Sequence, residues 1–289
     1  MRTLLYESSV IGRPRTLDEA RTAAGASTVR SSDGVTAYHV TGTTGPWVVM
    51  VNGLLAPMFT WQAMATALAA AGFRTLHYDL FGRGLSDRPD LAYDLATYAR
   101  QLVDLVRALG IDRAHFIGWS MGSLICSEVA IECPELVDRH VMIAPGFFVR
   151  EPRVIRLVAK LPFARELLAV AVRPFSELLP ANHLVRPDPV YRRRLRDQLR
   201  FRGIRRAVAC TVLTYPFDAG PSYRALGRHP RPILLMWGDR DTGTPHANAQ
   251  AVMSVFPRAE LMTFRGARHA PQLDHPAETH AAIVEFLRR

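Results

Sequence analysis

Residues 114–132 read AHFIGWSMGSLICSEVAIE, and the five letters from Gly118 to Gly122 join two different patterns. The residues before Gly118 form an apolar run typical of a buried strand, and those after Gly122 are typical of a helix. Small residues two before and two after Ser120 allow a sharp turn that exposes the serine hydroxyl at the start of the helix. A serine hydroxyl is a poor nucleophile unless a base lies within hydrogen-bonding reach. Ser120 is therefore a candidate nucleophile, and the rest of the chain should supply its base.

Strand and helix patterns alternate on both sides of this turn, which predicts βαβ units and a largely parallel sheet. The chain opens differently, because two strands flank the turn signal Ser32-Asp33-Gly34 and predict a hairpin. Helices are expected at 60–71, 98–109, 122–132, 247–255 and 277–287. Strands are expected at 27–31, 36–41, 47–51, 75–80, 114–118, 139–144, 233–237 and 259–264. The predicted fold class is α/β, with a mostly parallel sheet of eight strands flanked by helices.

The alternation stops between Gly146 and about Arg224, where short helical patterns are interrupted by prolines. A helical cap inserted into the sheet domain explains this break. The predicted organisation has four parts: an N-terminal extension, 1–27; the first part of the sheet domain, 28–146; the helical cap, 147–225; and the second part of the sheet domain, 226–289.

Two later segments supply candidate partners for Ser120, in the chain order Ser, Asp, His that this kind of turn predicts. Asp241 and His269 each follow a predicted strand. Asp239 and His275 are the nearby alternatives. We interpret Asp239 as a structural loop carboxylate and His275 as a residue at the start of a helix.

These motifs resemble those of capped α/β-hydrolase fold serine hydrolases of the esterase and lipase kind. In that family the acid usually lies in G-x-x-D-x-x-x-P, which the chain matches from Gly238 to Pro245. The histidine often lies in G-x-x-H-x-x-x-x-[ED]-x-P, matched from Gly266 to Pro276. The resemblance implies a catalytic triad of Ser120 as nucleophile, His269 as general base and Asp241 as the residue that orients the histidine.

The stretch from Asp79 to Ser86 also matches the family, in the pattern D-x-x-G-x-G-x-S. We interpret this loop as architectural and Asp79 as non-catalytic. An oxyanion hole needs two backbone N–H groups, and the resemblance assigns them to Met121, after the nucleophile, and to Leu54, in the loop after the third strand. The chain has Asn52-Gly53 where the family usually has His-Gly. Any role of that histidine in shaping the loop is therefore open.

The identity of residue 120 also separates the activities found on this fold. Haloalkane dehalogenases and epoxide hydrolases of the family carry aspartate at the nucleophile position, because their intermediate is an alkyl ester of a carboxylate. Enzymes that cleave carbon–carbon bonds in ring-fission products often have tryptophan after the histidine, where this chain has Ala270-Pro271. Ser120 argues against the first two activities, and Ala270 weakens the third. No zinc-ligand spacing and no G-x-x-x-x-G-K-[ST] loop occur, so we expect no metal and no cofactor.

The chain carries 36 Lys and Arg against 26 Asp and Glu, a formal net charge of +10. Such a charge raises nucleic acid as a partner, but Lys160 is the only lysine, and a strong arginine bias is typical of a GC-rich genome. We expect no nucleic-acid partner. The N-terminus lacks an apolar core of signal-peptide length, and no run of about eighteen apolar residues predicts an integral membrane segment. Three cysteines without paired spacing suit a reduced cytoplasm.

Two surfaces of the cap have alternative interpretations. Apolar residues at helical spacing within 154–172 predict the underside of a lid packed on the sheet domain, with a lipid-facing or lipophilic-substrate surface as the alternative. The run 191–206 is the most basic part of the chain, and a solvated helix face explains it most simply. The first alternative is a site for the phosphate of a coenzyme A or carrier-protein thioester, because arginine forks suit phosphate. RNA is the third and weakest interpretation. The arginines concerned are Arg192, Arg193, Arg194 and Arg196.

The expected reaction is hydrolysis of a carboxylic ester with an apolar acyl or alcohol part, through an acyl-serine intermediate. The expected partner is a small-molecule ester. A thioesterase or acyl cyclase of a biosynthetic pathway is the enzymatic alternative, and a small-molecule receptor that keeps the triad is the alternative from another class.

Overall fold

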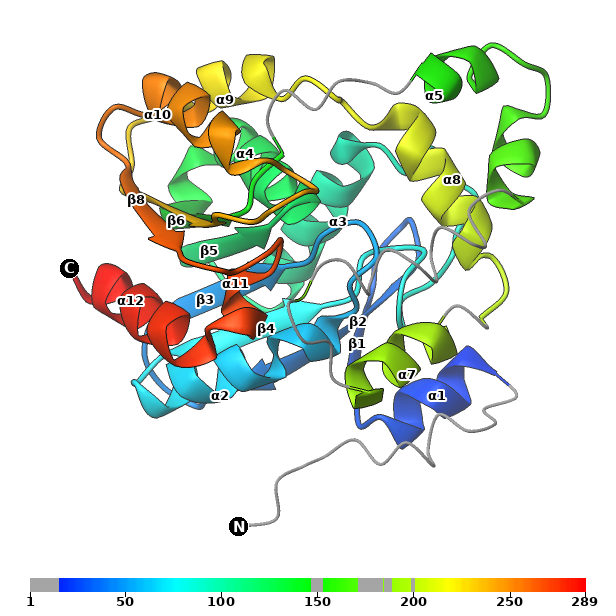
Figure 1. The fold of residues 1–289 in the computed structure, drawn as a ribbon. Coiled ribbons are helices and arrows are strands. Elements are labelled where there is room, and N and C mark those ends of the chain that lie inside the picture. Colours follow the sequence, from blue (N-terminus) through cyan, green and yellow to red (C-terminus); the bar gives the residue numbers. More distant parts are fainter. Residues whose placement is uncertain (1–15, 147–152, 171–183, 185–188, 199–200) are drawn as a thin grey trace.

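The computed structural model describes residues 16–146, 153–170, 184, 189–198 and 201–289. Its strands are β1 (Ser27–Arg30), β2 (Val35–Thr41), β3 (Trp47–Val51), β4 (Arg74–Tyr78), β5 (Ala114–Trp119), β6 (Val137–Ile143), β7 (Ile233–Gly238) and β8 (Glu260–Phe264). They form one sheet in the order β1-β2-β4-β3-β5-β6-β7-β8 (Figure 1). β2 pairs antiparallel with β1 and β4, and the other neighbours pair parallel. The predicted mostly parallel sheet of eight strands is confirmed.

Helices cover both faces of this sheet (Figure 1). One face carries α3 (Leu95–Ala108), α4 (Met121–Glu132), α9 (Gly220–Leu226) and α10 (Ala249–Val255), and the other carries α2 (Gln62–Ala70) and α12 (Pro276–Arg288). Val49 and Val51 of β3 belong to the core on the α3–α4 face, whereas Val48 and Met50 belong to the core on the α2–α12 face. Successive strand side chains point to opposite faces, so a strand buried on both faces has to be continuously apolar.

The elements begin and end close to the predicted positions, with short helices added between them. The helix expected from residue 60 begins as η1 (Met58–Trp61), and the one expected from residue 247 begins as η3 (His246–Asn248). Two further short helices are η2 (Pro134–Leu136) and α11 (Pro271–Asp274). Because β3 to β8 run parallel, the loops that follow them meet at one edge of the sheet. Asn52, Ser120, Asp241 and His269 all lie in loops or turns at that edge.

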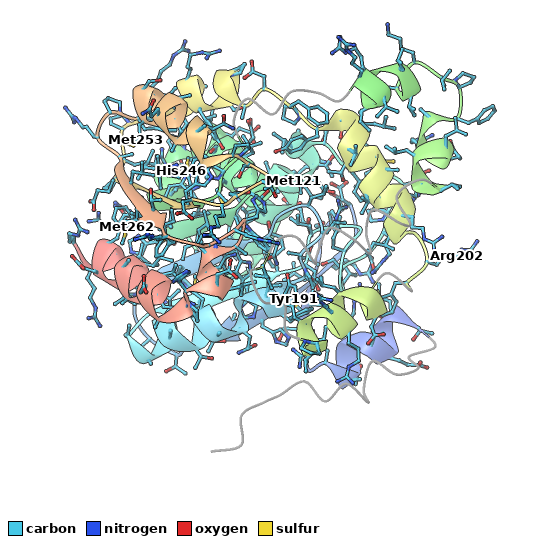
Figure 2. The ribbon with its side chains drawn as sticks, viewed as in Figure 1. Met121, Tyr191, Arg202, His246, Met253 and Met262 are labelled. Carbon is cyan, nitrogen blue, oxygen red and sulfur yellow. The ribbon has the colours of Figure 1, made fainter. Side chains whose placement is uncertain are left out.

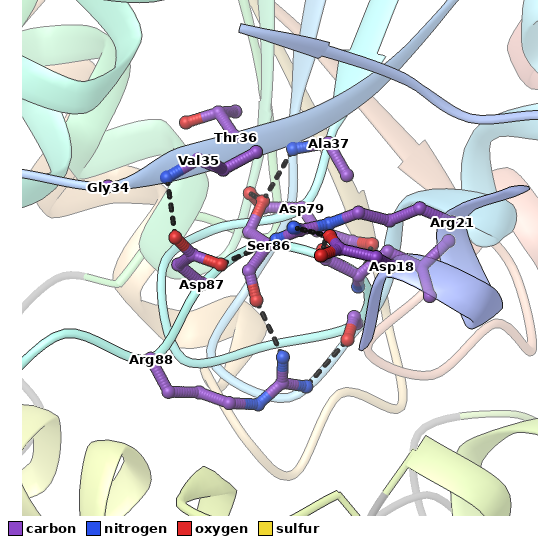
Figure 3. Close-up of polar contacts among 12 residues, drawn as sticks. Asp18, Arg21, Gly34, Val35, Thr36, Ala37, Asp79, Ser86, Asp87 and Arg88 are labelled. Carbon is purple, nitrogen blue, oxygen red and sulfur yellow. Dashed lines mark hydrogen bonds and ion pairs between the residues drawn. The ribbon is translucent and has the colours of Figure 1, made fainter. Parts of the chain in front are cut away.

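The N-terminal extension contains α1 (Leu17–Ala23), which we did not predict. A capping box begins this helix, because Thr16 Oγ1 accepts from the N–H of Glu19 and the Glu19 carboxylate accepts from the N–H of Thr16. The T-x-x-E spacing is the signal that could have identified it. Arg21 ties α1 to the sheet domain by donating to the Leu85 carbonyl at 2.8 Å and to Asp87 Oδ1 at 2.6 Å (Figure 3).

Between β6 and β7, the described residues form helices: α5 (Arg153–Val158), a second short helix at 164–170, α7 (Pro189–Gln198), α8 (Ile204–Thr214) and α9. α8 carries the buried residues Ala207 and Cys210, which belong to the larger core cluster. α9 packs on α4 and buries Tyr223 and Leu226 in the same cluster. The division into sheet domain and cap at 147–225 remains a prediction.

The apolar residues of 154–170 do not form the underside of a packed lid, so that prediction is wrong for most of them. Six large apolar side chains are exposed: Val154, Leu157, Leu161, Phe163, Leu167 and Val170. Leu168 does pack inward, against a small cluster around Ile204 and Val208. α5 and the helix at 164–170 lie at an outer corner of the molecule (Figure 1). Val172 lies outside the described residues.

The basic run is mostly a solvated surface where the structure describes it. Arg192 and Arg193 of α7 are exposed. Arg194 is half-buried, with its guanidinium 5.2 Å from the centre of the Phe59 ring. The side chain of Arg196 lies outside the described residues.

Candidate active site

Ser120 lies at a strained turn between β5 and α4. Its backbone has φ 55° and ψ −120°, a conformation that a residue with a side chain adopts at a cost of about 1–3 kcal/mol. Its N–H donates to the Ile143 carbonyl of β6 at 2.8 Å, which holds the turn against the sheet. Such strain is a feature of functional sites, where surrounding structure maintains it. The strand–turn–helix context predicted for Ser120 is present.

The two glycines of the turn are required by space. A Cβ at Gly118 would lie 2.5 Å from the backbone N of Ser123, and a Cβ at Gly122 would lie 2.2 Å from the Val51 carbonyl oxygen. Any larger residue would push α4 away from β3 and β5. The glycine spacing around Ser120 therefore follows from close backbone packing.

Asp241 and His269 lie in direct contact at the same edge of the sheet. The Nδ1 atom of His269 is 2.8 Å from Asp241 Oδ2. The Asp241 side chain is fully buried and the His269 side chain is 7% exposed. A buried carboxylate that accepts from Nδ1 fixes the ring orientation and leaves Nε2 as the nitrogen that can act as a base.

The remaining acceptor positions of Asp241 are also occupied. Its Oδ1 accepts from the N–H groups of Gly243 at 2.8 Å and Thr244 at 3.0 Å, and its Oδ2 lies 2.9 Å from Thr244 Oγ1. Burial raises the pKa of Asp241, but the hydrogen bond and electrostatic interaction with His269, together with the two donors of Thr244, outweigh burial and leave the pKa below its ordinary value. Asp241 is therefore an ionised, fully hydrogen-bonded carboxylate at neutral pH.

Gly238 allows the loop of Asp241 and the loop of His269 to approach each other. A Cβ at this position would lie 2.2 Å from the Arg268 carbonyl oxygen and 2.4 Å from that of Ala267. Asp239 is exposed and contacts the loop of His269 through the backbone: its Oδ1 accepts from the N–H of Gly266 at 2.7 Å.

His275 lies away from the Asp241 pair. It is the residue before α12, and its Nδ1 lies 3.7 Å from a Glu278 carboxylate oxygen. Of the two candidate carboxylates and two candidate histidines, Asp241 and His269 are the two that meet.

Trp119 connects the serine turn to the histidine loop, a role that the sequence analysis missed. Its indole Nε1 donates to the His269 backbone carbonyl at 2.7 Å, and the two rings lie 5.8 Å apart. The side chain is 2% exposed. Trp119 is adjacent to Ser120 in the chain, so this bond holds the loop of the candidate base close to the candidate nucleophile.

The loop after β3 also approaches the serine. A Cβ at Gly53 would lie 3.2 Å from Ser120 Cβ and 3.7 Å from its Oγ. The next residue, Leu54, is one of the two predicted oxyanion donors. The other, Met121, is the first residue of α4, and helix geometry leaves its N–H without an intrahelical partner. Figure 2 shows Met121 in the central part of the molecule.

Arg83 holds the Leu54 loop in place and is a second residue that the sequence analysis missed. Its Nε donates to the Leu54 carbonyl at 2.9 Å, and its terminal nitrogens donate to Tyr98 Oη at 2.8 Å and Thr211 Oγ1 at 3.0 Å. The side chain is fully buried. Through its guanidinium group, Arg83 thus connects the loop after β3 to α3 and to α8.

Asn52, which stands where the family usually has histidine, anchors the same loop. Its Oδ1 accepts from Thr60 Oγ1 at 2.8 Å, and the residue is fully buried. Thr60 lies in η1, so the amide connects the end of β3 to the helix that follows it.

Asp79 has a structural position, as expected. Its two carboxylate oxygens accept from the N–H groups of Met58 and Leu85, both at 2.7 Å. Ser86 Oγ donates to its carbonyl, and the N–H of Ala37 donates to Ser86 (Figure 3). Burial raises the pKa of Asp79, although both N–H donors oppose this. The loop from Asp79 to Ser86 thereby closes onto β2.

The described residues contain no group of three or more His, Cys, Asp or Glu side chains arranged to hold a metal ion. None of the helices in the described ranges is long and apolar enough to cross a membrane.

The serine turn, the buried Asp–His pair and the strand order together define a hydrolase of the α/β class. The family model described as "alpha/beta hydrolase fold" matches residues 46–276, and the chain belongs to that family.

Its curated relatives include enzymes of different activities. Haloalkane dehalogenase 2 of Mycobacterium tuberculosis is 27% identical over 259 residues, covering 86% of this chain and 90% of the relative. A 2-hydroxy-6-oxononadienedioate/2-hydroxy-6-oxononatrienedioate hydrolase of Burkholderia vietnamiensis is 26% identical over 268 residues, covering 87% of this chain and 90% of the relative. Among solved structures, the enol-lactonase from Burkholderia xenovorans LB400 aligns with a TM-score of 0.75 at 22% identity, covering 91% of this chain and all of that chain. These similarities support the fold and leave the substrate open.

Proposed function

We propose that the protein hydrolyses a carboxylic ester of an apolar small molecule through an acyl-serine intermediate. Ser120 is the nucleophile, His269 the general base and Asp241 the residue that orients His269. The backbone N–H groups of Leu54 and Met121 stabilise the oxyanion. The observation that carries the proposal is the strained Ser120 turn beside a buried Asp241–His269 hydrogen bond of 2.8 Å.

The reaction follows from these roles in two balanced steps. Ser120 Oγ attacks the ester carbonyl carbon as His269 Nε2 takes the hydroxyl proton, and the collapse of the tetrahedral intermediate breaks the carbon–oxygen bond of the ester. His269 gives its proton to the departing alcohol. A water molecule then attacks the acyl carbon as His269 Nε2 takes a proton from it. The bond between the acyl carbon and Ser120 Oγ breaks, His269 returns the proton to Oγ, and the acid is released.

The nature of residue 120 favours acyl transfer over the reactions named for the relatives. An alkyl halide needs a carboxylate nucleophile to form an ester intermediate, and Ser120 has no carboxylate. The 27% identity to haloalkane dehalogenase 2 therefore supports a shared fold and a hydrolytic reaction, but not dehalogenation. The residue after His269 is Ala270, which differs from the tryptophan that often follows the histidine in carbon–carbon hydrolases.

Pre-steady-state kinetics tests the proposal. With p-nitrophenyl esters of increasing acyl length, we expect a burst of p-nitrophenol equal to the enzyme concentration, followed by steady turnover. Ser120→Ala should abolish both phases. Halide release from a chloroalkane without ester turnover would contradict the proposal. A single turnover with the product retained would favour the receptor that keeps the triad.

Thioesters of coenzyme A form a second candidate substrate class, supported by the exposed cations Arg192 and Arg193 on α7. If these arginines bind phosphate, changing both to Gln should raise KM for the thioester and spare a neutral ester of the same acyl chain. Added salt should also weaken thioester binding, because charges are screened over about 10 Å at 0.1 M ionic strength. Equal responses of the two substrates would reject the thioester.

A further inference from the structure

The exposed apolar residues of the cap are concentrated in one short segment. The residues concerned are Val154 at 61%, Leu157 at 65%, Leu161 at 50%, Phe163 at 76%, Leu167 at 51% and Val170 at 76% exposure. Among described residues elsewhere, the exposed large apolar side chains are Val40, Val190, Leu261 and Met262, each between 37% and 43%. Single exposed apolar residues are ordinary, but six large ones within eighteen residues indicate an interaction surface. We call residues 153–170 the apolar hairpin.

The ionisable residues of the apolar hairpin are mostly basic. Arg153, Arg156, Lys160 and Arg165 carry positive charge, and Glu166 is the one acid. All five are exposed. The segment therefore combines large apolar side chains with a formal charge of +3 over eighteen residues.

The apolar hairpin is attached to the rest of the molecule on its inner side. Leu168 packs against Ile204 and Val208 of α8, and Leu55 contacts the same small cluster. Leu55 follows Leu54 in the loop beside Ser120. The inner side of the hairpin therefore packs on the same small cluster as a loop of the candidate active site.

We propose that the apolar hairpin docks the protein on the surface of an anionic lipid bilayer. The large apolar side chains enter the boundary between headgroups and acyl chains, and the exposed side chains of Arg153 and Lys160 contact the anionic headgroups, as in interfacial amphipathic helices. α5 is six residues long, so the segment lies on the bilayer and does not cross it.

Charge favours a lipid surface over a second copy of this chain. Two copies meeting through the hairpin would bring one +3 segment against another, within chains that each carry +10. Like charges at an interface oppose association. An anionic bilayer satisfies both the apolar and the basic side chains of the hairpin.

Vesicle flotation with the full-length protein tests this inference. The probes are vesicles of phosphatidylcholine alone and of phosphatidylcholine with phosphatidylglycerol at about 7:3, each at low and high salt. The apolar variant is Leu161→Asn, Phe163→Asn and Leu167→Asn combined. Asn suits the φ of 62° at position 163, because asparagine tolerates the left-handed region. The charge variant is Arg153→Gln with Lys160→Gln.

A matched control changes three exposed apolar residues outside the hairpin: Val40→Thr, Leu261→Thr and Met262→Thr. Threonine suits the strand positions of these residues. Thermal unfolding followed by circular dichroism checks that every variant folds. Ser120→Ala should float like the natural chain, so vesicle binding is measured independently of the proposed esterase activity.

We expect the natural chain and the control to float with anionic vesicles, and high salt to release them. The apolar variant should bind at least about 100-fold more weakly. The charge variant should lose roughly fivefold for each basic side chain removed. Equal binding to neutral vesicles, binding unchanged in the apolar variant, or no vesicle binding at all would overturn the inference. Self-association through the hairpin without vesicle binding, measured by light scattering, would also overturn it, as would selective binding of an acidic protein.

Discussion

Replacing Asp241 with asparagine removes the carboxylate while keeping the shape of the side chain. Asp241 Oδ1 accepts two backbone N–H groups, from Gly243 and Thr244, so the single oxygen of an asparagine should occupy that position. Its NH2 group would then face His269 Nδ1 across the present 2.8 Å contact. An amide N–H donates to Nδ1, which forces the ring proton onto Nε2 and removes the base that Ser120 needs.

The expected loss is about 10⁴-fold in kcat, the size observed when the triad aspartate of a serine protease becomes asparagine. This corresponds to roughly 5.5 kcal/mol in the activation barrier. KM should change little, because Asp241 is buried behind His269. The assay is steady-state hydrolysis of a chromogenic ester, with urea unfolding to show that the variant is folded.

Asp239→Asn is the matched control. Asp239 is exposed and accepts one N–H, from Gly266, and an asparagine oxygen can accept the same bond. We expect activity within a few-fold of the natural chain and a stability change within about 0.5 kcal/mol. If the folded Asp239 variant were inactive and the Asp241 variant active, the assignment of the acid would be reversed.

Two further predictions concern residues that support the site, and a third concerns His140, a buried residue of β6. Gly238→Ala should lower kcat by about 10² or more, because its Cβ would lie 2.2 Å from the Arg268 carbonyl oxygen and displace the histidine loop; a fully active variant would contradict the close approach of the two loops. Arg83→Met should lower the free energy of unfolding by roughly 3 kcal/mol, measured in urea, because the Leu54 carbonyl and the hydroxyls of Tyr98 and Thr211 lose their donor. An unchanged unfolding midpoint would refute this. Burial lowers the pKa of His140 to about 3 from an ordinary 6.5, so the unfolded chain takes up this proton at a higher pH than the folded chain does, and stability falls as the pH drops from 6.5 toward 3. Between pH 7 and pH 5 the free energy of unfolding should fall by about 2 kcal/mol. His140→Gln should remove that part of the pH dependence.

The sheet and the candidate site residues could be predicted because their signals are local. Continuous apolar runs identify strands such as β3, and the Gly-x-Ser-x-Gly spacing around Ser120 identifies the turn. Position after a strand identified the two loops that contain Asp241 and His269, since parallel strands bring their ends to one edge. The preference for Asp241 over Asp239 came from the family pattern, and the two side chains indeed make different contacts.

The remaining features depend on contacts between distant parts of the chain. Trp119 contacts a carbonyl 150 positions away, and Arg83 contacts a threonine 128 positions away, so no spacing rule identifies either role. The burial of the apolar hairpin could not be predicted for a different reason. Its helical periodicity is correct, but periodicity does not reveal whether an apolar face meets another element, and here most of that face meets none of the described residues.

The most direct test of the proposed mechanism is covalent labelling with a fluorophosphonate, followed by peptide mapping. The reagent reacts with a serine that a base has activated. We predict one adduct per chain, on the peptide that contains Ser120, with ester hydrolysis lost in proportion to labelling and no adduct in Ser120→Ala. An adduct on another residue, or full ester hydrolysis by a completely labelled Ser120, would contradict the acyl-serine mechanism.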